Sequence, residues 1–156
     1  MTCAELIRRL EAFDVAMAGH DSLEETKNVL LEMNQQQLDA GVRSDGELIH
    51  WLKDSHYPYT PAYAKRKARR GGEIRFVNLK VSETGFRKTE VVSLVGDEIQ
   101  YQSSIKLGDY LAQNYGSKIF GTTNENKEIY TKDHFFPAFK QKIQYATGLV
   151  FARSKR

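Results

Sequence analysis

The chain has 156 residues, of which 40% are hydrophobic and 28% are charged, and its formal net charge at pH 7 is +3. This length is typical of one domain whose core is large enough to fold without a metal or a disulfide, and the composition excludes an intrinsically disordered chain. The sequence has neither the apolar run of a signal peptide nor the about 20 consecutive apolar residues of a membrane span, so we expect cytoplasmic synthesis.

The first third of the chain predicts two helices. Apolar residues recur at spacings of four, three and four from Leu6 to Met17, which indicates an amphipathic helix that ends near Gly19. A second helix is expected to begin at Ser22, because Ser22 and Glu25 have the spacing of a capping box, and to end at Gly41. Four apolar residues are expected on its buried face: Val29, Leu30, Met33 and Leu38. Three glutamines are expected to face solvent or a subunit contact: Gln35, Gln36 and Gln37.

Residues 43–73 are predicted to leave the core as an excursion or arm. Turn-forming residues occur at 44–46 and again at Gly71 and Gly72. Within the arm, one or two helical turns are expected from Pro61 to Arg70, with Thr60 as the N-cap. Apolar residues predict that the first part of the arm is packed: Ile49, Trp51, Tyr57 and Tyr59.

Two extended segments and a tight turn predict a β-hairpin after the arm. Residues 76–81 and 87–95 are typical of strands, and the second leads through Gly96 and Asp97 into the alternating segment 98–103. Gly96 and Asp97 are residue types that tolerate the positive φ angles of a tight turn, so the hairpin is expected to reverse there.

The C-terminal part predicts two further helices. Helical spacing returns from Leu107 to Tyr115, and a glycine-containing loop is expected over residues 114–126. A last helix is expected to end before Gly148 and to pack three apolar residues in the core: Phe136, Phe139 and Ile143. The basic tail 152–156 is expected to be frayed.

This order of elements predicts one α+β domain over residues 1–156. A small antiparallel β-sheet is expected to be packed by the N-terminal and C-terminal helices, and a long basic loop or arm is expected over residues 43–73. Surface excursions often carry binding residues, so the arm is where we look first for function.

Motifs with a built-in catalytic mechanism are absent from the sequence. It contains no P-loop, dinucleotide-binding fingerprint, Gly-x-Ser-x-Gly or His-Glu-x-x-His motif. His50 and His56 have no common metal-ligand spacing, and the single cysteine, Cys3, excludes an internal disulfide and a cysteine-rich metal site. The adjacent residues Asp54, Ser55 and His56 do not have the geometry of a triad, because triads assemble in space. We therefore predict no catalytic residue, no cofactor and no metal, and we expect that the protein is not an enzyme.

Positive charge is concentrated in one short segment. Residues 1–58 contain five Lys and Arg against eleven Asp and Glu, whereas residues 59–89 contain nine against two. Five of these cations lie within six consecutive positions: Lys65, Arg66, Lys67, Arg69 and Arg70. Three interpretations fit them: a solvated helix face, a site for nucleic-acid phosphate beside Tyr59 and Tyr63, or a contact with an acidic neighbour such as a second copy of the chain.

Five segments occur in a characteristic order over roughly residues 28–148. They are MNQQQLDAGVRSDGELI, YTPAYAKRK, VNLKVSETGFRKTEVVSLVGDEIQYQS, LAQNYGSKIFGTTNEN and HFFPAFKQKI. The short motifs within them are Thr84-Gly85, Tyr115-Gly116, Ile119-Phe120-Gly121 and Phe136-Pro137-Ala138-Phe139. This order resembles small virion-morphogenesis proteins of tailed phages, the tail-completion or neck class. Phe86 and Thr122 depart from the leucines that are usual at these positions in that class.

The resemblance implies a non-enzymatic structural protein of a phage virion. Such a protein is expected to form or join a ring at the head-tail junction or the top of the tail, through which DNA passes, after assembly in the host cytoplasm. Its partners would be identical subunits, other connector, portal or tail proteins, and packaged DNA through nonspecific contacts, with no membrane involved. The alternative is a sequence-nonspecific nucleic-acid-binding protein that acts outside a virion, and the oligomeric state distinguishes the two.

Overall fold

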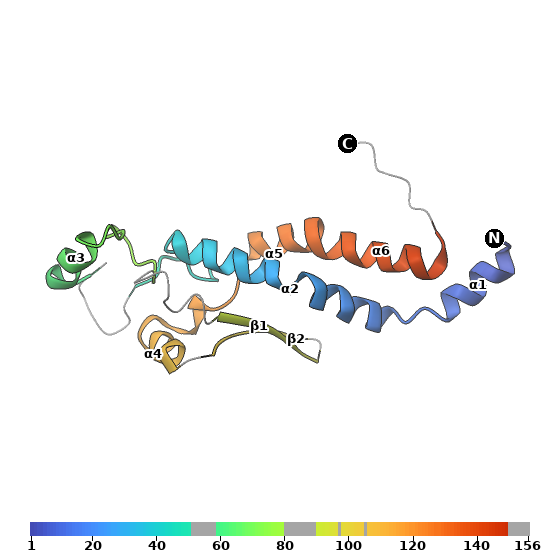
Figure 1. Cartoon of the computed structure of the whole chain (residues 1–156), viewed down its shortest axis with the longest axis horizontal. Coiled ribbons are helices and arrows are strands. Elements are labelled where there is room, and N and C mark those ends of the chain that lie inside the picture. The colour runs from blue at the N-terminus through green and yellow to red at the C-terminus, as the bar shows by residue number, and fades with distance from the viewer. Residues whose placement is uncertain (51–58, 80–89, 97, 105, 150–156) are drawn as a thin grey trace, which may run out of the picture.

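The structure is a computed structural model that describes residues 1–50, 59–79, 90–96, 98–104 and 106–149. Two long helices lie side by side along the molecule, a β-hairpin lies next to one of them, and a short helix projects at one end (Figure 1). The helices and strands are α1 (Cys3–Glu11), α2 (Val15–Asp39), α3 (Pro61–Ala68), β1 (Glu90–Val95), β2 (Glu98–Ser103), α4 (Lys106–Tyr115), α5 (Asn124–Tyr130) and α6 (Phe136–Thr147). A 3₁₀ turn at Ser117–Ile119 precedes α5, and a π-helical turn at Thr131–Phe135 joins α5 to α6.

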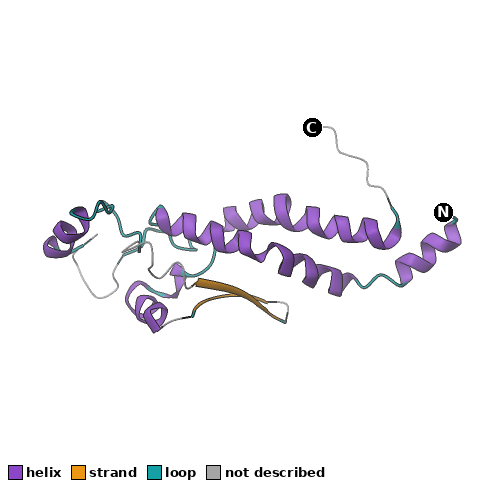
Figure 2. Ribbon diagram, in the orientation of Figure 1, coloured by secondary structure: helices purple, strands orange, loops and turns teal. Residues whose placement is uncertain are grey.

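Helices flank a two-stranded antiparallel sheet, so the predicted α+β class is confirmed. Helix α2 contacts both β1 and α6, and it lies between the hairpin and α6 (Figure 2). The predicted hairpin is also confirmed: Val92 is paired with Tyr101, and Gly96 has a φ of +61° where the chain reverses. This conformation favours glycine, which has no Cβ to clash with the backbone.

The strand predicted at 76–81 is wrong for residues 76–79, which are not in a strand. Leu79 has a φ of +52°, which interrupts an extended backbone, and Val77, Asn78 and Leu79 are all buried. A half-buried strand would instead alternate between buried and exposed residues. Residues 80 and 81, and the first part of the predicted strand 87–95 before Glu90, lie outside the described residues, as do Trp51, Tyr57 and the tail 152–156.

The two N-terminal helices exist, but the boundary predicted between them is wrong. Helix α1 ends at Glu11 and α2 begins at Val15, so Gly19 and Ser22 both lie inside α2. Asp14 is the N-cap, because its Oδ1 accepts a hydrogen bond from the Met17 N–H at 2.9 Å. The Ser22 side chain is fully buried, and its Oγ donates to the Ala18 carbonyl at 2.7 Å. Tertiary packing of this part of α2 on α6 therefore outweighs the local capping signal.

This boundary predicts different effects for two alanine substitutions. Asp14→Ala is expected to lower the free energy of unfolding by about 1 kcal/mol, because it removes the N-cap acceptor. Ser22→Ala is expected to change it by less than about 0.5 kcal/mol, because alanine continues a helix well and the lost hydrogen bond is local. Urea unfolding followed by circular dichroism measures both values. A larger loss for Ser22→Ala would support a cap at Ser22.

Polar side chains on α2 hold the loop that precedes α5. Asn34 Nδ2 donates to the Gly121 carbonyl at 2.7 Å and to the Ile119 carbonyl at 3.2 Å. Gln37 donates to the same Gly121 carbonyl at 3.2 Å and accepts from the Thr123 N–H at 2.9 Å. Gln37 is consequently buried, so the expectation that all three glutamines face solvent or a subunit contact is wrong at this position. Backbone groups of the loop need partners, and α2 supplies them.

The core joins segments that are far apart in the sequence. Six buried residues form it: Leu38, Ile49, Val77, Leu79, Tyr115 and Ile119. Tyr59, the residue before α3's cap, packs against this cluster. The predicted apolar anchors Ile49 and Tyr59 therefore tie both ends of residues 50–59 to the core. On α2, Leu30 and Leu38 are buried as predicted, while Val29 and Met33 are partly buried.

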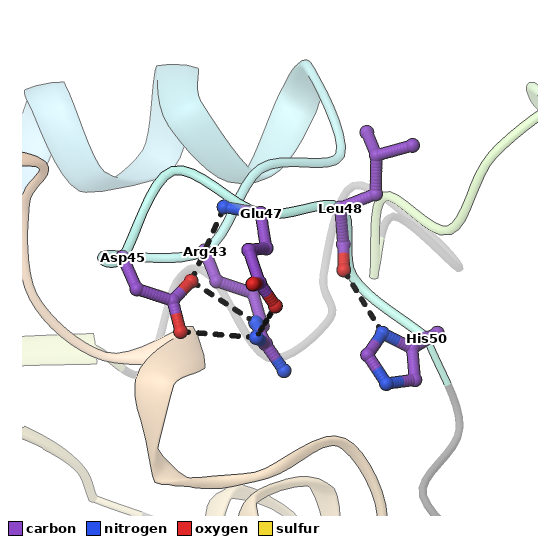
Figure 3. Close-up of polar contacts among 5 residues, drawn as sticks. All are labelled: Arg43, Asp45, Glu47, Leu48 and His50. Carbon is purple, nitrogen blue, oxygen red and sulfur yellow. Dashed lines mark hydrogen bonds and ion pairs between the residues drawn. The ribbon is translucent and has the colours of Figure 1, made fainter.

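A salt-bridged turn begins the predicted arm (Figure 3). Arg43 is buried, and its guanidinium donates to Asp45 Oδ2 at 2.9 Å and to Glu47 Oε2 at 2.5 Å. Burial opposes ionisation of Asp45, but hydrogen bonds from the Glu47 N–H and from Arg43 outweigh it and hold the pKa of Asp45 below its usual value. Arg43 thus closes a local turn and does not extend the basic surface.

The last helix ends as predicted, with Gly148 at a φ of +74°, but its packing differs from the prediction. Phe136 is 55% exposed, so it is not a core residue, whereas Phe139 and Ile143 are partly buried. The ring of Phe135 stacks on that of Phe139 at 5.8 Å between centroids. Phe135, the last residue of the π-helical turn that joins α5 to α6, is partly buried, whereas Phe136 is not.

Candidate basic interaction site

Helix α3 carries the predicted basic cluster and is built from local signals. Thr60 is its N-cap, with Oγ1 accepting from the Tyr63 N–H at 3.4 Å, and Pro61 occupies the first helical position. Both features were predicted and both are confirmed. The helix projects from the end of the molecule, beyond the pair formed by α2 and α6 (Figure 2).

Four of the five predicted cations are exposed, two of them on α3 and two at its C-cap and in the turn that follows. They are Lys65, Arg66, Arg69 and Arg70. Because residues four positions apart are neighbours on a helical surface, Lys65 lies near Arg69, whose backbone is still helical. We call these four residues the basic face of α3. Their close spacing gives a strong positive potential that is open to a partner.

Lys67 is the exception, because only 6% of it is exposed. Its Nζ donates to Asn78 Oδ1 at 2.8 Å and to the Tyr59 hydroxyl, and the ammonium lies 4.4 Å from the centroid of the Tyr59 ring. The stem of Lys67 also fills the space beside Gly72, where a Cβ would lie 2.7 Å from Lys67 Cγ. Lys67 therefore anchors α3 to the core and is not a residue of the basic face.

The sequence contained a signal for this inward position. Lys67 follows Tyr63 by four residues and Ala64 by three, and both of these are partly buried, so all three share the inner side of α3. Counting charges along the chain does not reveal this, because a helix separates neighbouring residues by about 100°. Long lysine stems also pack readily on aromatic surfaces.

The tyrosines near the basic face are occupied within the protein. The rings of Tyr59 and Tyr63 are 5.1 Å apart, and the Arg66 guanidinium lies over the Tyr63 ring at 5.0 Å. Lys67 lies over the ring of Tyr59. An open stacking platform for bases needs a free aromatic face. The arrangement therefore favours a partner that offers negative charge over one that offers bases for stacking.

Arg75, which follows α3, is neutralised locally. Its guanidinium donates to both carboxylate oxygens of Glu73, at 2.8 and 3.1 Å. Hydrogen bonds from the Arg75 side chain and backbone lower the pKa of Glu73 to about 2. Because Glu73 stays ionised at neutral pH, this pair has no net charge, and Arg75 does not extend the basic face.

The described residues contain no group of three or more His, Cys, Asp or Glu side chains that could hold a metal ion. The adjacent residues Asp54, Ser55 and His56 lie outside the described part of the chain, so the sequence-based expectation for them stays a prediction. Cys3 is exposed. Among the helices described, none is long and apolar enough to span a membrane.

No known protein family, curated protein or solved structure matches this chain. The resemblance to tail-completion proteins therefore stays a prediction from the short motifs.

Proposed function

We propose that this protein is a non-enzymatic structural component of a tailed-phage virion that forms or joins a ring at the head-tail junction or the top of the tail. DNA would pass through this ring, and the subunits would assemble in the host cytoplasm. The observation that carries the proposal is the basic face of α3, which projects from the end of the molecule on a helix anchored by Lys67. The order of the sequence motifs supports the same class of protein.

A ring requires each subunit to present two different surfaces to its two neighbours. A projecting charged helix suits one of these surfaces, because it can reach an adjacent subunit or an adjoining portal, connector or tail protein. The same cations can hold DNA phosphates loosely and without reading the base sequence. We favour a protein partner, since a ring subunit has more contact with its neighbours than with passing DNA.

Mass photometry of the purified protein, alone and mixed with neck components of a tailed-phage virion, tests this proposal. We expect a multi-subunit species or binding to a ring or particle. Bovine serum albumin in place of the neck components provides the control for nonspecific association. A strict monomer that joins neither rings nor particles would contradict the proposal.

The second candidate is a sequence-nonspecific nucleic-acid-binding protein that acts outside a virion, and the four exposed cations favour it. Replacing Lys65, Arg66, Arg69 and Arg70 with alanine while retaining Lys67 separates the two functions. A nucleic-acid-binding protein would lose affinity for duplexes of any sequence, and the wild type would show a log-log salt slope of about −0.9 per phosphate neutralised. A ring protein with a protein partner would bind DNA poorly from the start and lose assembly.

A further inference from the structure

Helix α2 carries an acidic stripe along its full length. Starting from the N-cap, acidic residues recur at spacings of seven, four, seven and seven, and all are exposed: Asp14, Asp21, Glu25, Glu32 and Asp39. These spacings place the side chains on one side of the helix. The buried residues Leu30, Asn34 and Leu38 lie on other sides of α2, toward the core. We call the five acidic residues the acidic face of α2.

The acidic face contains no cation of α2 itself. The single Lys or Arg in α2 is Lys27, which lies away from the stripe and forms an ion pair with Glu24. Lys142 of α6 forms an ion pair with Glu25 at 3.2 Å, and the His20 ring lies 3.9 Å from the Asp21 carboxylate. A solvated helix surface usually mixes both signs of charge, so a stripe of one sign favours a positively charged partner.

We propose that the basic face of α3 in one copy of the chain docks against the acidic face of α2 in a second copy. This inference rests on the proposed ring and names the two surfaces that would join its subunits. The partners have opposite charge, and their sizes agree: α3 is about 12 Å long and α2 about 37 Å long, so α3 fits along part of the stripe.

The contact has to form between copies. Figure 1 shows α3 beyond the C-terminal end of α2, so the basic face does not lie along the stripe of its own chain. The two surfaces also differ, and a contact between unlike surfaces is heterologous. Repeated contacts of this kind close into a ring when the rotation between subunits permits it. Electrostatic complementarity would select this arrangement over pairs of like-charged surfaces.

Charge reversal on each surface tests the inference. The first variant carries Asp21→Lys and Glu32→Lys on α2, and the second carries Lys65→Glu and Arg69→Glu on α3; Lys67 is retained in both. We expect each variant alone to self-associate at least about tenfold more weakly than the wild type at 0.1 M salt, because the reversals reduce the formal charge of the acidic face from −5 to −1 and that of the basic face from +4 to 0. Sedimentation velocity measures the association.

Mixing the two variants provides the decisive measurement. The unchanged basic face of the first variant matches the unchanged acidic face of the second, so an equimolar mixture is expected to recover association as mixed pairs. Glu125→Lys with Glu128→Lys on α5 matches the charge change of the first variant, and Lys127→Glu with Lys132→Glu matches that of the second; both controls are expected to associate like the wild type. Circular dichroism checks that each variant is folded.

Three outcomes would overturn the inference. If the wild type assembles and the reversed variants assemble equally well, these surfaces do not join the subunits, although the ring proposal stands. If each variant fails to self-associate and the equimolar mixture also fails to associate, the substitutions do not act through contact between these two faces, and the proposed docking is wrong. If the wild type does not self-associate, the pairing fails, and the ring proposal fails with it unless the protein joins a ring of neck components.

Discussion

Leu38→Ala is expected to lower the free energy of unfolding by about 2–5 kcal/mol. Leu38 is fully buried and lies in the cluster that joins the end of α2 to Ile49, Val77 and Ile119. Alanine would leave a cavity that the surrounding segments cannot easily close, because each of them is already held elsewhere: Ile119, for example, accepts a hydrogen bond from Asn34.

Urea unfolding of Leu38→Ala and of a matched control measures this effect. Leu48→Ala removes the same atoms from a side chain that is 52% exposed, and it is expected to change the stability by no more than about 0.5 kcal/mol. Similar losses for the two variants would contradict the placement of the core. A loss for Leu38→Ala alone would show that the end of α2 organises the packing of the later segments.

Lys67→Met is expected to lower the free energy of unfolding by about 1–3 kcal/mol, although the same change on the basic face has little effect. Methionine retains most of the apolar stem beside Gly72 but removes the ammonium that donates to Asn78 and to the Tyr59 hydroxyl. It also removes the cation from the Tyr59 ring. Lys65→Met is the control, because Lys65 is exposed on the same helix.

Two measurements separate the role of Lys67 from that of the basic face. Urea unfolding reports the loss of stability, and hydrogen exchange reports whether amides of residues 61–68 lose protection in Lys67→Met. Equal protection in both variants would contradict an anchoring role for Lys67. If Lys67 is an anchor, a variant with all five cations of the cluster replaced by alanine would be less stable and would also lose the positive charge of the basic face. Tests of assembly or DNA binding should therefore retain Lys67.

Elements with strong local signals were predicted well. Helix α3 begins at the predicted cap, Thr60, the hairpin reverses at Gly96, and the last helix ends before Gly148. In each case the residue satisfies or permits a backbone conformation within a few positions of itself, so neighbours in the sequence contain the necessary information. The α+β class follows from these elements and is confirmed.

The function-bearing surface was predicted in part. Composition located the basic cluster and the acidic N-terminal segment, but it did not separate Lys67 from the four exposed cations. That separation depends on Tyr59 and Asn78, which come from outside α3 and approach only one side of it. The acidic face of α2 was also hidden, because the boundary placed at Ser22 divided one long helix into two parts.

The sequence by itself determined helix α3 and its cap, the hairpin and its turn, the end of the last helix, and where the charges lie along the chain, because these properties depend on residues within a few positions. The tertiary structure alone decided which signals prevail. Helix α2 continues through Gly19 and Ser22 because it packs on α6. Gln37 is buried because its side-chain amide donates a hydrogen bond to the Gly121 carbonyl. A positive φ at Leu79 ends the extended segment, and Phe136 is exposed although its spacing to Phe139 and Ile143 is that of a core residue. Each outcome is set by partners that are distant in the sequence, whose burial and hydrogen bonds outweigh local preferences of about 1 kcal/mol or less.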